Sequence, residues 1–516
     1  MSDFFSPEQR RRFRHSQSLR DGFPVPTRSI SNGEFDPLPQ TREQKGVEAR
    51  LESIAATEGR RLGMDRREFL RSSCGMAAAF LAMNSIFGEV FSVETAEAGE
   101  PDRAEARRRS LSSQFIFDDQ VHFVHEDFTA EFMLDYARYA SEHWNPTMLD
   151  EMGIELDRYR FDNFIKEVYL DSDTRVCLVS SAPTTGDVGG LLVSNEQMAQ
   201  TRELVNRLAG SRRMLSHAVF IPGRDGWLDE VDRAIETLSP DAWKGYTVGN
   251  PFHPQNLPYR LDDEKLMYPF YEKVVASGIN RICIHKGLLP RDYLTSLRGI
   301  WRHAMVDDVG PAAKDWPQIE FVIYHAGLRP YLAPPDLELA EFERAGTIPW
   351  VSDLAEIPER YGVSNVYGEI GSAFANSCVT NPRFCAAMMG TLIKGMGVDH
   401  VVWGTDSVWY GSPQWQIEAL RRLEIPGDLR ERHGFAPLGE ADGAVKNAIL
   451  GGNGARLYGL DPQETTGALA SDRIDQMKRE YRERGIGRSN ATWGYVVDEE
   501  SSRRAEARED VASSRS

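Results

Sequence analysis

The chain has 516 residues, of which 41% are hydrophobic and 27% are charged, a balance typical of a globular protein with a substantial core. Its formal net charge of −18 disfavours nucleic acid and anionic membrane surfaces as partners, so we expect a small-molecule substrate and no nucleic acid. Five cysteines are too few for a disulfide framework in a chain of this length.

The first 63 residues are rich in arginine, glutamine, serine, glutamate and proline, and this composition predicts a disordered or weakly helical N-terminal extension. A different pattern occupies residues 64–98. Arg66 and Arg67 precede Phe69 and Leu70, an apolar run covers 75–88, and small residues alternate at 96–98. These features resemble a twin-arginine export signal, which predicts contact with the twin-arginine export machinery and a periplasmic or otherwise extracytoplasmic location. The alternative is a short amphipathic helix, since more than sixty residues precede the arginines.

Between residues 112 and 460, eight short apolar runs alternate with amphipathic stretches. Their starts are roughly 30 to 60 residues apart, which leaves room for a helix and two loops in each interval. Continuous apolar runs indicate strands that are buried on both faces, as in parallel sheets. Eight such units predict an α/β fold, a (β/α)8 barrel of the TIM type, rather than an open doubly wound sheet. The runs are 115–117, 176–179, 215–221, 246–248, 282–284, 321–323, 366–367 and 401–403.

Two further segments flank this pattern. The longest interval, 123–175, contains helix-like stretches at 131–143 and 156–169, and predicts a cap inserted after the first strand. Residues 461–516 are polar, and predict a charged helix at 472–484, an extended arm at 485–497 and a disordered tail.

Polar side chains follow five of the predicted strands directly. They are Gln120 and His122 after the first strand, His285 and Lys286 after the fifth, His325 after the sixth, Glu369 after the seventh and Asp406 after the eighth. The carboxyl ends of barrel strands meet at one mouth, so these groups are expected to be neighbours. A single histidine after a strand is more often a packing residue. Three imidazoles and one carboxylate at equivalent strand ends instead predict a site for zinc or a similar ion.

Other residues near these strand ends are candidates for contacts with the substrate. Lys286 is placed to meet a substrate carboxylate, or equally to form a salt bridge with an acidic loop residue. Trp409 and Tyr410 lie next to Asp406 and suggest an aromatic or cyclic substrate. Glu369 is equally consistent with a solvated loop and with the site.

The strand ends, the Gly-Thr-Asp sequence at 404–406 and the segment 449–458 together resemble the amidohydrolase superfamily. They are most similar to the branch that contains aminocarboxymuconate-semialdehyde decarboxylase, and the resemblance covers roughly residues 115–460. It implies a metal-dependent hydrolase, in which metal-activated water attacks a C–N or C–O bond of a small carboxylated or cyclic substrate. A metal-dependent decarboxylase of the same branch is the alternative.

The same resemblance implies one divalent metal ion, Zn²⁺ or alternatively Mn²⁺ or Fe²⁺. The implied ligands are Gln120, His122, His285 and Asp406, and the catalytic candidates are Asp406, His325 and Glu369. Lys286, Trp409 and Tyr410 are the substrate-binding candidates because of their positions at the strand ends. In this scheme Asp406 takes a proton from the metal-bound water, and His325 contacts that water or the substrate. A homo-oligomer is left open.

Gln120 departs from the family pattern, which has a histidine at this position. A carboxamide is a neutral, weak ligand for zinc, so the site is expected to hold metal less tightly or through only three strong groups. For this reason, a catalytically inactive exported barrel with a binding or scaffold role is a further alternative. Lys244 lies too early in the predicted fourth strand to bridge two ions, so a mononuclear site is expected.

Overall fold

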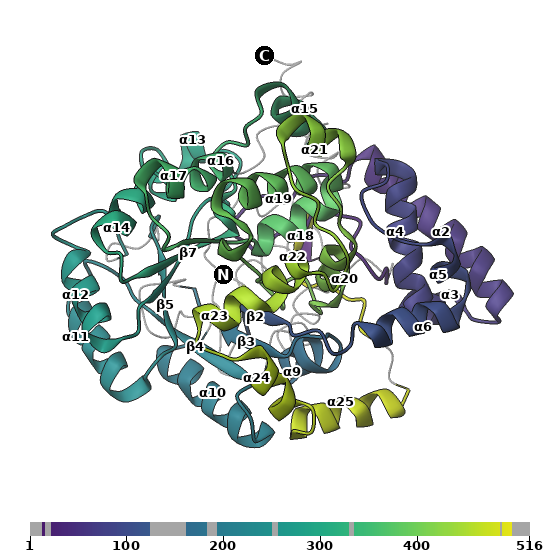
Figure 1. Cartoon of the computed structure of the whole chain (residues 1–516), viewed down its shortest axis with the longest axis horizontal. Helices are drawn as coiled ribbons and strands as arrows, with labels where there is room; N and C mark the ends of the chain where they lie inside the picture. The colour runs from purple at the N-terminus through teal and green to yellow at the C-terminus, as the bar shows by residue number, and fades with distance from the viewer. Residues whose placement is uncertain are drawn as a thin grey trace, which may run out of the picture.

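The computed structural model describes residues 13–15, 22–123, 161–182, 193–249, 256–329, 335–485 and 488–497. Eight parallel strands form one sheet in sequence order, from β2 to β9 (Figure 1). They are β2 (Phe117–Val121), β3 (Val176–Val179), β4 (Met214–Val219), β5 (Ala242–Tyr246), β6 (Arg281–His285), β7 (Glu320–Tyr324), β8 (Val366–Glu369) and β9 (Val401–Val402). The sheet closes because Asp119 N donates to Trp403 O, 2.9 Å away, and Asp406 N donates to Gln120 O at the same distance. The (β/α)8 barrel is therefore confirmed.

An outer layer of helices covers this sheet (Figure 1). Its principal members are α10 (Asn195–Ala209), α11 (Trp227–Arg233), α12 (Tyr268–Ser277), α14 (Val309–Asp315), α15 (Pro335–Ala345), α18 (Gly371–Thr380), α19 (Pro382–Met396) and α20 (Gln414–Arg422). Apolar side chains such as Leu178, Leu215 and Val322 fill the barrel interior below the carboxyl ends of the strands. The predicted cap falls mostly on residues 124–160, outside the described part of the chain. Only α9 (Phe161–Ile165) and the turn after it are described.

One strand lies earlier in the sequence than its apolar pattern predicted. The fourth barrel strand was expected at 246–248, but β5 covers Ala242–Tyr246. Lys244 interrupts the apolar run, yet its side chain is buried, with Nζ 3.4 Å from the centre of the Tyr324 ring. Lys244, which was expected too early in this strand to bridge two ions, is its middle residue, and the mononuclear site stays a prediction. An aromatic ring inside the barrel compensates part of the cost of burying its charge.

The N-terminal extension is folded over most of its length. Five helices precede the barrel and lie together at one side of it, coloured purple to blue in Figure 1. They are α2 (Arg42–Leu62), α3 (Arg66–Arg71), α4 (Ser73–Phe87), α5 (Thr95–Gly99) and α6 (Pro101–Ser110). Residues 1–63 were predicted to be disordered or weakly helical, and α2 is instead a well-formed helix of 21 residues. Its apolar stripe of Val47, Leu51 and Ala55 is short, but it is buried within the same core as α4. Composition alone cannot show that this partner exists.

The segment predicted as an export signal is part of this packing. The Phe80 ring of α4 lies 4.9 Å from the Phe91 ring, and Ser92 N donates to Arg422 O of the barrel at 2.7 Å. Arg422 also forms an ion pair with Glu97 at 2.6 Å. Twin-arginine export and an extracytoplasmic location remain predictions. Among the helices that the structure describes, none combines the length and the apolar character needed to cross a membrane.

The C-terminal segment returns towards the N-terminal one. The charged stretch at 472–484 forms helix α25 (Arg473–Glu483), and the extended arm ends in β10 (Tyr495–Val497). β10 pairs antiparallel with β1 (Phe13–His15), and Tyr495 also exchanges two backbone hydrogen bonds of 2.8 Å with Ser31. The predicted tail at 498–516 lies outside the described residues. Backbone hydrogen bonds thus join the N-terminal segment to the C-terminal segment.

Replacing Phe80 with alanine tests whether α4 is part of the folded core. Phe80 is 0% exposed, so we expect the variant to lower the free energy of unfolding by about 3–5 kcal/mol, the usual cost of such a cavity. Denaturant unfolding of the full-length protein measures this change. Ile86→Ala in the same helix is the matched control, because Ile86 is 38% exposed and its truncation should cost much less. An equally small effect for Phe80→Ala would show that α4 does not pack in the folded protein.

Candidate active site

Two of the predicted site residues have left-handed backbone conformations. His325 has φ 60° and Asp406 has φ 55°, values that side chains other than glycine rarely adopt. Hydrogen bonds hold both residues in place. His325 N donates to Glu369 Oε2 at 3.0 Å, and Asp406 N donates to Gln120 O at 2.9 Å. Backbone strain of this kind persists where surrounding contacts over-determine it, often at functional sites.

His122, Gln120 and Asp406 form one group at the barrel mouth. His122 Nδ1 donates to Ser180 O at 2.9 Å, so Nε2 is the ring nitrogen that can act as a ligand. Nε2 lies 3.1 Å from Asp406 Oδ1 and accepts a hydrogen bond from Gln120 Nε2 at 3.3 Å. Gln120 Oε1 is buried without a hydrogen-bond partner among the described residues. The first-strand pair therefore does face the strand-eight carboxylate.

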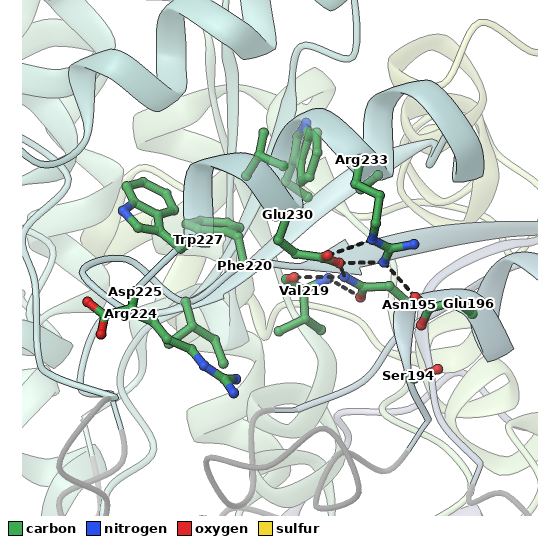
Figure 2. Close-up of a pocket in the computed structure, with 15 residues that line it drawn as sticks. Ser194, Asn195, Glu196, Val219, Phe220, Arg224, Asp225, Trp227, Glu230 and Arg233 are labelled. Atoms are coloured by element: carbon green, nitrogen blue, oxygen red, sulfur yellow. Dashed lines mark hydrogen bonds and ion pairs between the residues drawn. The ribbon is translucent and has the colours of Figure 1, made fainter.

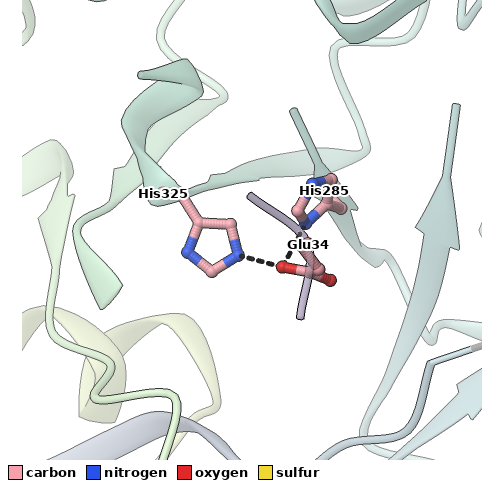
Figure 3. A group of neighbouring side chains, drawn as sticks. All are labelled: Glu34, His285 and His325. Atoms are coloured by element: carbon pink, nitrogen blue, oxygen red, sulfur yellow. Dashed lines mark ion pairs between the residues drawn. The ribbon is translucent and has the colours of Figure 1, made fainter. Parts of the chain in front are cut away.

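A second group brings His285 and His325 together with a residue that the sequence did not indicate. Glu34, from the N-terminal extension, places Oε2 3.6 Å from His285 Nδ1 and 3.9 Å from His325 Nε2 (Figure 3). Ligand atoms of these three residues lie within 4.8 Å of one another, and all three side chains are buried. The predicted ligand set is thus divided, with His285 in one group and His122, Gln120 and Asp406 in the other.

Asn32 and Ser372 connect the two groups. Asn32 Nδ2 donates to Glu34 Oε2 at 2.6 Å and to Asp406 Oδ2 at 2.8 Å. Ser372 Oγ donates to the same Asp406 oxygen at 2.5 Å. Both carboxylates are therefore held by donors that are themselves buried.

The donor set fits a divalent metal ion. Both ring nitrogens of His285 are buried without a hydrogen-bond partner among the described residues, and a buried imidazole is normally satisfied. His325 differs, because Ser372 N donates to its Nδ1 at 3.2 Å. The neutral His325 ring therefore carries its proton on Nε2, which suits donation to a substrate better than coordination. His285 and the neighbouring carboxylates are the residues that would hold such an ion, and mixed nitrogen and oxygen donors suit zinc, manganese or iron.

Comparison with known proteins supports this fold. The amidohydrolase family model matches residues 169–460. The chain belongs to the amidohydrolase family. No curated protein matches the chain in sequence.

Several solved structures are similar to this amidohydrolase at low sequence identity. A TIM-barrel protein from Bordetella bronchiseptica is 14% identical with a TM-score of 0.42, and the match covers 68% of this chain and 99% of that one. The 5-carboxyvanillate decarboxylase of Sphingomonas paucimobilis is 15% identical with a TM-score of 0.36, covering 67% and 100%. A dihydroxybenzoic acid decarboxylase of Polaromonas sp. JS666, solved with bound manganese, is 13% identical with a TM-score of 0.37, covering 67% and 97%. Likeness at this level concerns the fold alone.

Burial determines the electrostatics of the amidohydrolase site. It lowers the pKa of His285 and lowers that of His325 to about 3, so both rings are neutral. Burial, together with the Asp406 charge, raises the pKa of Glu34 to about 7. Burial also acts to raise the pKa of Asp406, but contacts with His122, His325 and Ser372 outweigh it and the net shift is downward. Asp406 is therefore the carboxylate that stays ionised most readily.

The remaining predicted site residues differ in whether they face the barrel mouth. Lys286 is fully buried and donates to both oxygens of Asp308 at 2.8 and 2.9 Å, which is the salt-bridge alternative rather than a group aimed at substrate. The Glu369 carboxylate accepts hydrogen bonds from the backbone N–H groups of His325 and Gly371, so it fixes the backbone that follows β7 and β8. The Tyr410 hydroxyl lies 2.6 Å from Ser372 Oγ. The Trp409 ring centre lies 6.1 Å from that of His122.

Sequence reasoning missed Glu34, Asn32 and Ser372. Glu34 and Asn32 lie in a stretch with asparagine, glycine and proline, which predicts a loop and carries no metal-binding spacing. Ser372 opens a helix that follows the seventh strand, three residues beyond Glu369. Its position after a strand was the only signal available.

A separate cavity of ≈ 300 Å³ lies beside β4 and the starts of α10 and α11 (Figure 2). Asn195 donates to Val219 O at 3.1 Å, and Arg233 forms an ion pair with Glu230 at 2.6 Å. Asn195, Glu230 and Arg233 are thus engaged in contacts on the wall of the cavity (Figure 2), and the residues lining this cavity include none of the predicted site residues. The cavity therefore gives no sign of taking part in chemistry at the barrel mouth.

Proposed function

We propose that this amidohydrolase is a metal-dependent enzyme that acts on a small carboxylated, aromatic or cyclic substrate at the barrel mouth. The observation that carries the proposal is the buried side chain of His285. Neither of its ring nitrogens has a hydrogen-bond partner among the described residues, and it lies beside a carboxylate and a second imidazole. Burial of unsatisfied polar atoms is costly, and a bound cation is the usual compensation for this combination of ligands.

Some residues at the mouth would bind the metal ion, and others position the substrate or the backbone. The ligands that we propose are His285, His122 and Asp406, with Gln120 as a weaker donor through its carbonyl oxygen, which has no hydrogen-bond partner among the described residues. His285 lies in a different group from the other three, so a bound ion would have to draw the two groups together. A bound divalent ion supplies Lewis-acid chemistry and neutralises a substrate carboxylate. His325 presents Nε2–H to the substrate, because Ser372 N fixes the proton on that side of the ring. Glu369 keeps the His325 backbone in place.

Decarboxylation is the reaction that this geometry favours. In hydrolysis Asp406 would have to accept a proton from water, but its Oδ2 already accepts two hydrogen bonds and its pKa is lowered. Such a carboxylate is a weak base. Loss of CO2 starts from the ionised substrate. The bond between ring carbon and carboxylate breaks, its electron pair stays on the ring carbon, and that carbon takes a proton from the Nε2–H of His325, which solvent water then replaces. Burial of the mouth destabilises the localised carboxylate charge relative to the charge spread over the ring as CO2 leaves.

Hydrolysis is the second candidate, and one contact supports it. His122 Nε2 and Asp406 Oδ1 lie 3.1 Å apart, so the two side chains together form an imidazole–carboxylate pair that could accept a proton. The sequence resemblance is consistent with both reactions, and fold and ligand types alone do not separate them.

A paired assay distinguishes the two reactions. Full-length protein is stripped of metal with a chelator and reloaded separately with Zn²⁺, Mn²⁺ and Fe²⁺. One set of assays uses hydroxylated aromatic acids as substrates, and a second set uses cyclic amides, lactones and esters. We expect metal-dependent CO2 release from an aromatic acid, and none from His285→Ala. Metal-dependent ring opening or ester cleavage without CO2 release would support hydrolysis instead.

A further inference from the structure

The N-terminal segment 29–36 crosses the barrel mouth before helix α2 begins, and it is fixed at several points. The anchors are Ser29 Oγ to Asn376 Oδ1 at 3.0 Å, the two backbone bonds of 2.8 Å between Ser31 and Tyr495, and Arg291 N to Asp36 Oδ2 at 2.6 Å. These partners come from α18, from the C-terminal arm and from the loop after β6. The segment is therefore held by three distant parts of the chain.

A local turn aims Glu34 into the mouth. Gly33 has φ 99°, a conformation that favours glycine, and its N–H donates to Ser31 Oγ at 2.9 Å. Glu34 N donates to Asn32 Oδ1 at 3.0 Å, while the Asn32 amide group donates to Glu34 Oε2. The side chain of Asn32 thus fixes both the backbone and the carboxylate of Glu34. These hydrogen bonds hold the Glu34 side chain in one orientation, so it is preorganised in the barrel mouth.

The environment of Glu34 lacks the partner that a buried carboxylate requires. Glu34 is 4% exposed, and no lysine or arginine among the described residues forms an ion pair with it. Its nearest neighbours are instead the neutral imidazoles of His285 and His325. Burial and the charge of Asp406 raise its pKa, and the Lys244 charge acts on it only without an ion pair. Burying an ionised carboxylate without a cation costs several kcal/mol. A carboxylate facing an unpartnered imidazole is, by contrast, a common arrangement of metal ligands.

We propose that Glu34 is a ligand of the metal ion, supplied to the barrel by the N-terminal segment. It adds the strong donor that the site lacks at Gln120, where the side chain is a neutral carboxamide. This inference rests on the proposed function, since it requires that the barrel mouth binds a metal. It also means that residues 22–98 belong to the functional enzyme, because cleavage near Ala98 would remove a ligand.

Metal titration of full-length protein tests this proposal without an activity assay. Metal-free wild type, Glu34→Gln and Asp36→Asn are titrated with Zn²⁺ and Mn²⁺ in a calorimeter, and the melting temperature is measured with and without metal. We expect Glu34→Gln to weaken metal binding at least tenfold, the effect of losing one good contact. Its metal-free form should melt no earlier than wild type, because the substitution removes a buried charge. Asp36→Asn alters a carboxylate of the same segment that bonds to Arg291 N, and should bind metal as wild type does.

The outcomes separate this inference from the proposed function. Equal metal affinity of wild type and Glu34→Gln, with weaker binding by His285→Ala, would overturn the role of Glu34 and leave the metal site standing. Failure of wild type to bind any of the metals would overturn both. If Glu34→Gln does not fold, Glu34→Asp replaces it in the test. Its carboxylate is one methylene shorter, so affinity should again fall, and unchanged affinity would contradict the proposal.

Discussion

Replacing Asp406 with asparagine is expected to lower turnover at least a hundredfold. The substitution preserves shape but removes the negative charge that pairs with His122 at 3.1 Å and most of the strength of the residue as a ligand. Loss of a group at the reacting centre commonly has this magnitude, whether the group binds metal or moves a proton. Turnover is measured on the substrate found in the paired assay, with saturating metal so that weaker binding does not limit the rate.

Two further variants serve as controls for Asp406→Asn. Ser372→Ala removes one hydrogen bond to Asp406 Oδ2 and should reduce turnover less than the loss of the carboxylate does. Asp399→Asn changes a carboxylate whose side chain is 63% exposed, and should leave turnover unchanged. Near-normal turnover of Asp406→Asn would remove Asp406 from the mechanism under either reaction.

Replacing Arg421 with methionine is expected to destabilise the barrel by about 3–5 kcal/mol, the cost of removing one partner from a buried ion pair. The Arg421 side chain is 0% exposed and pairs with Asp173 and Glu418, each at 2.8 Å. Methionine fills similar space but leaves two buried carboxylates with fewer partners. Denaturant unfolding measures the difference. Arg383→Met is the control, because its partner Asp428 is 66% exposed and such pairs contribute about 0–1 kcal/mol.

The same network gives the wild type a defined pH dependence. Burial acts to raise the pKa of Glu418, but the charges of Arg421 and two neighbouring arginines outweigh it and lower the pKa to about 2. A lowered folded-state pKa contributes stability that is fully present above the ordinary value of 4.5 and is lost as the pH falls towards 2. The stability gap between wild type and Arg421→Met should therefore narrow below pH 4.5. A gap that widens in acid would contradict the ion-pair explanation.

The barrel and much of its mouth could be predicted because parallel strands follow a simple rule. Residues after the first, fifth, sixth and eighth strands meet at one end, so His122, His285, His325 and Asp406 could be placed by their position after apolar runs. β5 was misplaced because its inward-facing Lys244 interrupts the apolar pattern. Lys286 was ambiguous because a strand-end lysine can face the mouth or a loop acid, and only the structure shows Asp308 beside it.

The contribution of Glu34 could not be predicted from local sequence. Glu34 lies more than two hundred residues before His285, in a segment whose composition indicates no regular structure. Its position depends on contacts with Asn376 and Tyr495, which tertiary folding alone brings together. The same limit applies to α2 and α4. Their apolar side chains are buried against each other and against the barrel, and the local sequence does not show these partners.

Metal content of the purified full-length protein tests the central claim most directly. After incubation with Zn²⁺, Mn²⁺ or Fe²⁺ and removal of unbound ion, elemental analysis should find about one ion per wild-type chain, as expected for a mononuclear site. His285→Ala, which removes the imidazole with two unpartnered nitrogens, should retain markedly less. If wild type and His285→Ala both retain no ion above background with any of the three metals, the mouth is not a metal site. That result would favour the alternative of an inactive barrel with a binding or scaffold role.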